Sequence, residues 1–122
     1  MILMSVADAM IVTRGEQIKL YRRTQIGVDE YNRPEYDWPD VGNPTSQPYA
    51  IFDKIREDEI IVEAGEIIVA DYKIYFKSIE NVLKDDQVIW NTQRFEIIAI
   101  QQRRHTSAPR FKVAYSKRLI EQ

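Results

Sequence analysis

The stretch from Asp85 to Ile100, DDQVIWNTQRFEIIAI, constrains the fold more than any other part of the chain. It predicts two β-strands, at Gln87–Trp90 and Arg94–Ile100, joined by a tight turn at Asn91-Thr92-Gln93. Side chains alternate along a strand, so the second strand presents two faces. Both faces carry large apolar groups: Phe95, Ile97 and Ala99 on one, and Glu96, Ile98 and Ile100 on the other. Such a strand needs cover on both faces, which predicts a central strand of a sheet.

Four further segments alternate in the way strands do. They are Gln17–Arg23, Tyr49–Ile55, Glu66–Lys77 and Phe111–Arg118, the last with Phe111, Val113 and Tyr115 pointing inward. Ile60–Ala64 fits either a short strand or a single helical turn, and Ser78–Lys84 fits one turn of helix. About seven short strands separated by turn residues predict an all-β fold, a small antiparallel β-barrel or sandwich. The length of 122 residues suits a single domain over residues 1–122.

One short helix is predicted near the start of the chain, at about residues 5–14. Ser5 is a suitable N-cap, and Gly15 is well placed to end the helix. Leu3, Val6, Met10 and Thr13 recur at helical spacing and form one stripe. A helix this short is marginal alone, so it must dock, either on its own β-structure or on another subunit.

The segment from Thr24 to Pro48 is unusual for a compact domain. It holds four of the five prolines and several Gly, Asn and Asp residues, so it cannot form a regular central strand. Connections of this length are usually functional or mobile. Tyr31, Tyr36 and Trp38 are aromatic groups here with no evident core to join. Two interpretations stay open: a lid that folds back over the barrel, or a loop whose aromatics meet a partner.

Composition excludes several kinds of site. There is no cysteine, which rules out disulfides, thiolate zinc sites and cysteine nucleophiles. The single histidine, His105, lies in a turn segment, and no glycine-rich phosphate loop or nucleophile elbow occurs. We therefore expect no enzyme activity, no metal and no cofactor. The N-terminus does not look like a secretory signal, and no apolar run reaches the roughly 20 residues of a membrane span. We expect a soluble protein, made in the cytoplasm, with no membrane partner.

Several positively charged residues are grouped in short stretches of the sequence. The net charge of −2 argues against a protein that binds nucleic acid with its whole surface. A basic cluster lies at one predicted hairpin tip: Arg103, Arg104, Arg110 and Lys112, beside His105. Arg22 and Arg23 end the first predicted strand. Each group is expected to be a solvated strand end; a shared positive rim that faces DNA is the alternative.

Several short motifs follow one another in a recognisable order. Leu20-Tyr21-Arg22-Arg23-Thr24 leads into residues 29–38, DEYNRPEYDW, and a Tyr-Ala-Ile-Phe strand follows at residues 49–52. Later come Lys-Ile-Tyr-Phe at 73–76, Lys-Asp-Asp-Gln-Val-Ile-Trp at 84–90 and Arg-Phe-Glu-Ile-Ile-Ala-Ile at 94–100. Over residues 17 to 118 this order resembles the head-closure, or head-tail joining (connector), proteins of tailed bacteriophages.

The resemblance implies a structural virion protein at the head-tail interface of a tailed phage or prophage. It implies a small β-barrel that assembles with copies of itself into a ring, closes the DNA-filled head, and meets portal, adaptor and tail proteins. Residues 24–48 would be the interaction or gating arm, whose contact residues would be Tyr31, Asn32, Arg33, Pro34, Tyr36 and Trp38. Arg103, Arg104, Arg110 and Lys112 could face a neighbouring ring or packaged DNA.

Other functions fit the same residues. A tail-completion or stopper protein of the same assembly is one. A small β-barrel that binds single-stranded nucleic acid or oligosaccharide is another, although base-stacking surfaces interleave aromatics with arginines and the basic cluster here lacks them. A small hydrolase lacks a nucleophile, base or metal constellation. Under the connector hypothesis, removing Gln25–Gln47 is expected to leave a folded barrel that cannot join heads to tails.

Overall fold

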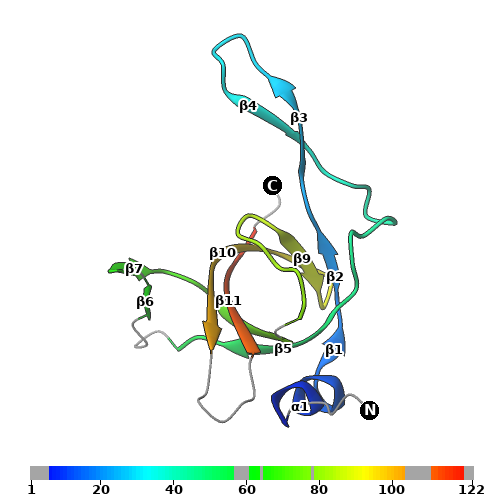
Figure 1. Ribbon diagram of the computed structural model, residues 1–122, viewed down its shortest axis with the longest axis vertical. Helices are drawn as coiled ribbons and strands as arrows, with labels where there is room; N and C mark the ends of the chain where they lie inside the picture. Colours follow the sequence, from blue (N-terminus) through cyan, green and yellow to red (C-terminus); the bar gives the residue numbers. More distant parts are fainter. Residues whose placement is uncertain (1–5, 57–60, 64, 78, 104–110, 120–122) are drawn as a thin grey trace.

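In the computed structural model, which describes residues 6–56, 61–63, 65–77, 79–103 and 111–119, the chain forms a nearly closed antiparallel β-barrel (Figure 1). Seven strands make one sheet in the order β1-β5-β8-β11-β10-β9-β2. Their bounds are β1 Glu16–Gln17, β2 Lys19–Tyr21, β5 Tyr49–Lys54, β8 Tyr72–Lys77, β9 Gln87–Trp90, β10 Gln93–Arg103 and β11 Phe111–Arg118. The all-β prediction is confirmed. β10 pairs with β11 on one side and β9 on the other, so the predicted central strand is central.

The barrel closes through one continuous segment. β1 and β2 are the two outer strands of the sheet, yet they follow each other in the chain, separated by Ile18. β1 pairs with β5, and β2 pairs with β9. The strand predicted at Gln17–Arg23 is thus two short strands with different neighbours. The segment therefore crosses from strand β5 to strand β9 and forms hydrogen bonds with both. Few backbone groups at the edges of the sheet are then left unpaired.

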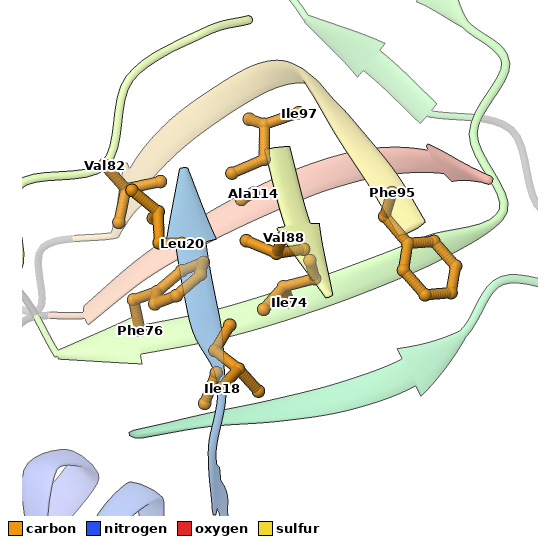
Figure 2. Close-up of a cluster of buried hydrophobic side chains, with 10 residues drawn as sticks. Ile18, Leu20, Ile74, Phe76, Val82, Val88, Phe95, Ile97 and Ala114 are labelled. Carbon is orange, nitrogen blue, oxygen red and sulfur yellow. The ribbon is translucent and has the colours of Figure 1, made fainter. Parts of the chain in front are cut away.

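The barrel interior is filled by side chains of β2, β5, β8, β9, β10 and β11, together with Ile18 and Val82 (Figure 2). Leu20, Ile74, Phe76, Val88 and Phe95 are completely buried there. At one end of the interior four rings gather: Phe52 stacks on Trp90 with centroids 4.2 Å apart, and Tyr72 and Phe95 pack edge-on or tilted against them. β5 and β9 are not neighbours in the sheet, so Phe52 and Trp90 meet across the interior.

A second apolar cluster lies on the outside of the sheet. β6 (Ile61–Glu63) and β7 (Glu66–Ile68) form a separate hairpin beside the barrel, and Ile61 and Ile68 pack with residues of β11. Phe111, Val113 and Tyr115 belong to this outer cluster, whereas Ala114 packs in the interior. The prediction that these three residues point inward is therefore wrong. The sequence correctly identifies the apolar face of β11 but cannot show that the hairpin covers it from outside.

The alternation along β10 breaks at a β-bulge between Ile97 and Ala99. Phe95 and Ile97 pack in the interior as predicted, but Ile100 joins them there, and Ala99 packs with Ile98 in the outer cluster. An extra residue at a bulge exchanges the two faces of the strand beyond it. The predicted assignment of Ala99 and Ile100 is wrong for this reason.

The predictions for the turns and the shorter elements have different outcomes. The turn before β10 has two residues, Asn91 and Thr92, both with positive φ (51° and 62°), and Gln93 already pairs with Trp90. Two positive φ angles are typical of the hairpin turn whose twist matches antiparallel strands. The predicted Glu66–Lys77 strand is two strands, β7 and β8, and Ile60–Ala64 contains strand β6. Residues 79–84 are not helical, unlike the helical turn predicted at Ser78–Lys84; they lead into a turn where Asp85 has φ 74°.

The helix, α1, spans Val6–Arg14 and packs on β5 and β8 of its own barrel. Among residues 9–14, whose side chains are described, Ile11 is the buried one, while Met10 is 45% exposed and Thr13 is exposed. The predicted stripe is therefore wrong at Met10 and Thr13, while Leu3 and the side chain of Val6 lie outside the described residues. No helix of the described residues is long and apolar enough to cross a membrane.

Gly15 ends the helix, as predicted. Its N–H donates to the Ile11 carbonyl oxygen at 2.8 Å. A Cβ at this position would lie 2.2 Å from the Ile11 carbonyl oxygen and 2.7 Å from that of Ala50, both backbone atoms that cannot move aside alone. Only glycine allows helix α1 to approach strand β5 this closely.

Gly15→Ala should therefore destabilise the protein by about 1 to 3 kcal/mol, the usual effect of overpacking. Denaturant unfolding followed by circular dichroism measures it. Gly42→Ala is the matched control, because a Cβ there meets nothing within 4 Å. Equal stability of the two variants would contradict the close packing of helix and strand.

Candidate interaction site

The proline-rich segment contains a regular hairpin that projects from the barrel. β3 (Thr24–Val28) pairs with β4 (Pro34–Asp37) in a sheet of their own, with a bulge between Gln25 and Gly27. Every residue of both strands is exposed. Figure 1 shows the hairpin extending away from the barrel, so it is not a lid. We call residues 24–37 the arm. As predicted, the proline-rich segment contributes no strand to the centre of the barrel sheet. Its own two strands were not predicted.

The tip of the arm is built around Asp29. One carboxylate oxygen accepts the backbone N–H groups of Tyr31 (2.9 Å) and Arg33 (2.8 Å), and the other accepts Arg33 Nε (3.0 Å). The Asn32 N–H donates to the Asp29 carbonyl, and Asn32 has φ 62°, a conformation that Asn tolerates better than most residues. These contacts fix the tip although little of it is buried.

The structure brings most of the predicted contact residues together on this hairpin. Tyr31, Asn32 and Arg33 form the tip, and the Tyr31 side chain is 71% exposed, with the Arg33 guanidinium 5.0 Å from its ring centre. Pro34 begins β4, a position where the missing N–H is tolerated. Tyr36 lies in β4. Trp38 follows the strand and is half-buried, so it is not part of the exposed tip.

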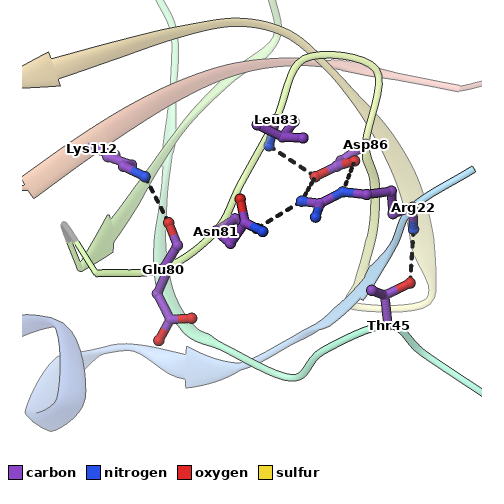
Figure 3. Close-up of polar contacts among 7 residues, drawn as sticks. All are labelled: Arg22, Thr45, Glu80, Asn81, Leu83, Asp86 and Lys112. Atoms are coloured by element: carbon purple, nitrogen blue, oxygen red, sulfur yellow. Dashed lines mark hydrogen bonds and ion pairs between the residues drawn. The ribbon is translucent and has the colours of Figure 1, made fainter.

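The base of the arm is held by an ion pair that sequence analysis missed (Figure 3). Arg22 donates from Nε (3.1 Å) and from a terminal nitrogen (2.8 Å) to the two carboxylate oxygens of Asp86, which is 3% exposed. Arg22 also donates to the Asn81 carbonyl, and Asp86 accepts the Leu83 N–H. The hydrogen bonds to Asp86 raise the pKa of Arg22 despite its partial burial. Such a bidentate pair fixes orientation as well as distance.

Arg23 makes the second contact at the base. Its guanidinium lies 3.6 Å from the ring centre of Tyr36 in β4 and forms an ion pair with Asp85 at 3.2 Å. Arg22 and Arg23 were expected to be solvated strand ends, and the structure contradicts this. The adjacent pairs Arg22-Arg23 and Asp85-Asp86 are visible in the sequence, but about 60 residues separate them and only the fold brings them together.

The end of the predicted loop 24–48 belongs to the barrel. The Leu20 N–H donates to the Ser46 carbonyl, and Thr45 and Ser46 donate back to the Leu20 carbonyl. Ile18 N–H donates to the Pro48 carbonyl, and Tyr21 Oη donates to the Val41 carbonyl at 2.6 Å. Removing Gln25–Gln47 would delete Val41, Thr45 and Ser46 from these partners and leave only Pro48. The expectation that such a deletion leaves the barrel intact is therefore not supported.

The segment that carries the arm is acidic. Residues 24–48 hold five carboxylates and one cation: Asp29, Glu30, Glu35, Asp37 and Asp40 against Arg33. Their charge is −4, so the rest of the chain carries +2 of the total of −2. Exposed apolar groups lie among these acids, with Ile26 63% and Val28 56% exposed. An apolar surface bordered by carboxylates is suited to a protein partner with the opposite charge.

Most of the predicted basic cluster lies outside the described residues. Arg104, Arg110 and His105, and the side chain of Arg103, lie outside them. Lys112 lies in β11, and its ammonium donates to the Glu80 carbonyl at 2.7 Å, as Figure 3 also shows. No group of three or more metal-ligating side chains occurs among the residues that the structure describes.

Comparison with known proteins adds a fold relationship. No family model matches the chain, and no curated protein matches it by sequence. A solved structure is similar: the phage-like element PBSX protein xkdH from Bacillus subtilis, with a TM-score of 0.54 and 15% identity. The similarity covers 85% of this chain and 93% of that one. At this identity it shows a shared fold.

The Arg22–Asp86 pair predicts unequal effects at two adjacent arginines. Arg22→Ala leaves a buried carboxylate unpaired and should cost about 3 kcal/mol of unfolding free energy. Arg23→Ala removes a partly exposed pair and should cost about 1 kcal/mol or less. Denaturant unfolding of both variants tests this, and similar losses would show that the Arg22–Asp86 pair does not hold the base.

The hydrogen bonds of Asp29 predict that its removal loosens only the tip of the arm. Asp29→Ala removes three hydrogen bonds at the tip and should speed amide exchange at Tyr31 and Arg33 several-fold, as expected for about 1 kcal/mol of local stability. Glu30→Ala is the matched control. Hydrogen exchange followed by NMR measures both. A fall in the global unfolding midpoint for Asp29→Ala would mean that the arm is not an independent unit.

Proposed function

We propose that this protein is a structural virion component of a tailed phage or prophage, one subunit of a ring in the head-tail connector. The observation that carries the proposal is the barrel fold shared, over most of both chains, with a protein of a phage-like element. The motif order in residues 17–118 supports it. In this role the protein acts by binding and has no catalytic function.

The arm supports a contact role within that ring. A ring subunit must reach its neighbours, and a hairpin fixed at its base by Arg22 and Arg23 presents its tip at a defined place. Preorganised contact elements bind more tightly because less conformational entropy is lost on assembly. Tyr31, Asn32, Arg33 and Pro34 would make the contacts, and copies of this chain, the portal or adaptor, and tail proteins would be the partners.

The charge of the arm argues against the alternative of a nucleic-acid-binding barrel. A surface that tracks a phosphate backbone needs an excess of cations. The arm instead carries four carboxylates and one cation, a net charge of −3. Within the connector proposal the arm therefore meets protein, and any contact with packaged DNA falls to other surfaces.

A shortened arm tests the proposal. Thr24 pairs with Asp37, so Gln25–Tyr36 can be replaced by an Asn-Gly turn without disturbing residues 45–48. The variant should fold, shown by an unchanged circular dichroism spectrum, but should not complement a phage from which the gene is deleted. Electron microscopy should show DNA-filled or emptied heads and separate tails. Gly42→Ala, a change outside the arm, should still complement.

Two results would contradict this. Infectious tailed particles from the deleted phage would show that the protein is not a connector component. Infectious particles from the shortened variant would show that the arm is not its contact element.

A further inference from the structure

A groove at one end of the barrel combines cations with exposed apolar side chains, and this surface is complementary to the acidic, apolar surface of the arm. Its volume is about 610 Å³, and it lies between the end of β5, strand β7, the start of β8 and the end of β11. Its lining residues include Lys54, Arg56, Ile67, Val69, Asp71 and Arg118. Ile67 and Val69 are 72% and 76% exposed, among the most exposed apolar side chains described. Exposed apolar groups next to a groove indicate a contact surface.

The groove is positively charged along its lining. Lys54, Arg56 and Arg118 face one carboxylate, that of Asp71, which already accepts the backbone N–H of Arg118 at 2.8 Å. With the other described residues, none of the three cations forms a salt bridge. Within the described part of the chain, no salt-bridge partner competes with carboxylates of another molecule for these cations.

The arm presents the complementary pattern. Its exposed apolar side chains, Ile26, Val28 and Tyr31, lie in a hairpin that also carries Asp29, Glu30, Glu35 and Asp37. Apolar contact between Tyr31 and Val69, with carboxylates against Lys54 and Arg118, would satisfy both surfaces. Aromatic anchors surrounded by charge pairs are typical of specific protein interfaces.

The two surfaces are separate regions of one molecule. The arm projects from one part of the barrel, whereas the β6–β7 hairpin that borders the groove leaves it elsewhere (Figure 1). Contact between them therefore joins two copies, each offering a different surface to the next. A repeated contact of this head-to-tail kind closes into a ring when the rotation between copies allows it. A ring is what the proposed function requires.

We propose that the arm of one copy docks in the Lys54–Arg118 groove of the next copy, and that this contact builds the ring. The inference rests on the proposed function for its biological setting, but its test uses only the purified chain. The chain has no cysteine, so no native thiol competes with the engineered cysteines.

The experiment mixes Tyr31→Cys protein with Val69→Cys protein and follows disulfide-linked dimers by non-reducing electrophoresis. Ile79→Cys is the matched control, because Ile79 is 83% exposed and follows the other end of β8. Docking raises the local concentration of the two thiols, so the Tyr31–Val69 dimer should form about ten times faster than the Tyr31–Ile79 dimer. Equal rates would overturn the proposal.

Charge reversal tests the electrostatic part. Lys54→Glu with Arg118→Glu in the Val69→Cys protein should remove the rate advantage, and so should Glu30→Lys with Glu35→Lys in the Tyr31→Cys protein. Mixing the two reversed proteins should restore it. Loss without restoration would overturn docking in this groove.

The two proposals fail differently. If cross-linking shows no preference but the shortened arm still blocks head-tail joining, the arm contacts another protein and only the groove assignment is wrong. If the shortened arm complements fully, the proposed role of the arm is wrong whatever the cross-linking shows.

Discussion

Closure of the barrel by the segment Glu16–Tyr21 is the constraint on which the rest of the structure depends. The first part of the segment pairs with β5 and the second with β9, so the two outer strands of the sheet are one piece of chain. Two further contacts hold it there. Trp90 Nε1 donates to the Glu16 carboxylate at 2.8 Å, and residues 45–48 pair with Leu20 and Ile18. Without this segment the sheet would have two exposed edges, which favour pairing with other chains.

The same segment determines where the arm points. The arm begins three residues after β2, and Arg22 and Arg23 between them are tied to Asp86 and Asp85 of the turn before β9. The direction of an otherwise exposed hairpin is thus set by side chains at its base, because the hairpin has almost no buried surface of its own. This arrangement separates two tasks: the barrel supplies stability, and the arm supplies an exposed surface at a fixed position.

The sequence predicts the local features well because they depend on local rules. Alternation identifies β5, β9, β10 and β11, and Gly15 and Asn91 mark the end of a helix and a hairpin turn. The predictions are wrong where contacts between distant parts of the chain determine which face of a strand points into the barrel. The bulge in β10 exchanges Ala99 and Ile100, and the cover over β11 makes its apolar face an outer one. At the site, Tyr31 and its neighbours are visible as exposed aromatics and turn residues, whereas the Arg22–Asp86 pair joins residues 64 positions apart.

The fold similarity and the arm carry different parts of the functional proposal. A barrel shared at 15% identity is compatible with many binding roles, since functions are determined by sites that differ between proteins of one fold. The distinguishing feature of this chain is that its negative charge is concentrated in the arm while the remainder is weakly positive. Under the proposed docking, this division of charge favours contact between the arm of one copy and the groove of the next and disfavours arm-to-arm contact, because like charges repel. The proposed contact is of the head-to-tail kind, which is the geometry from which rings are made.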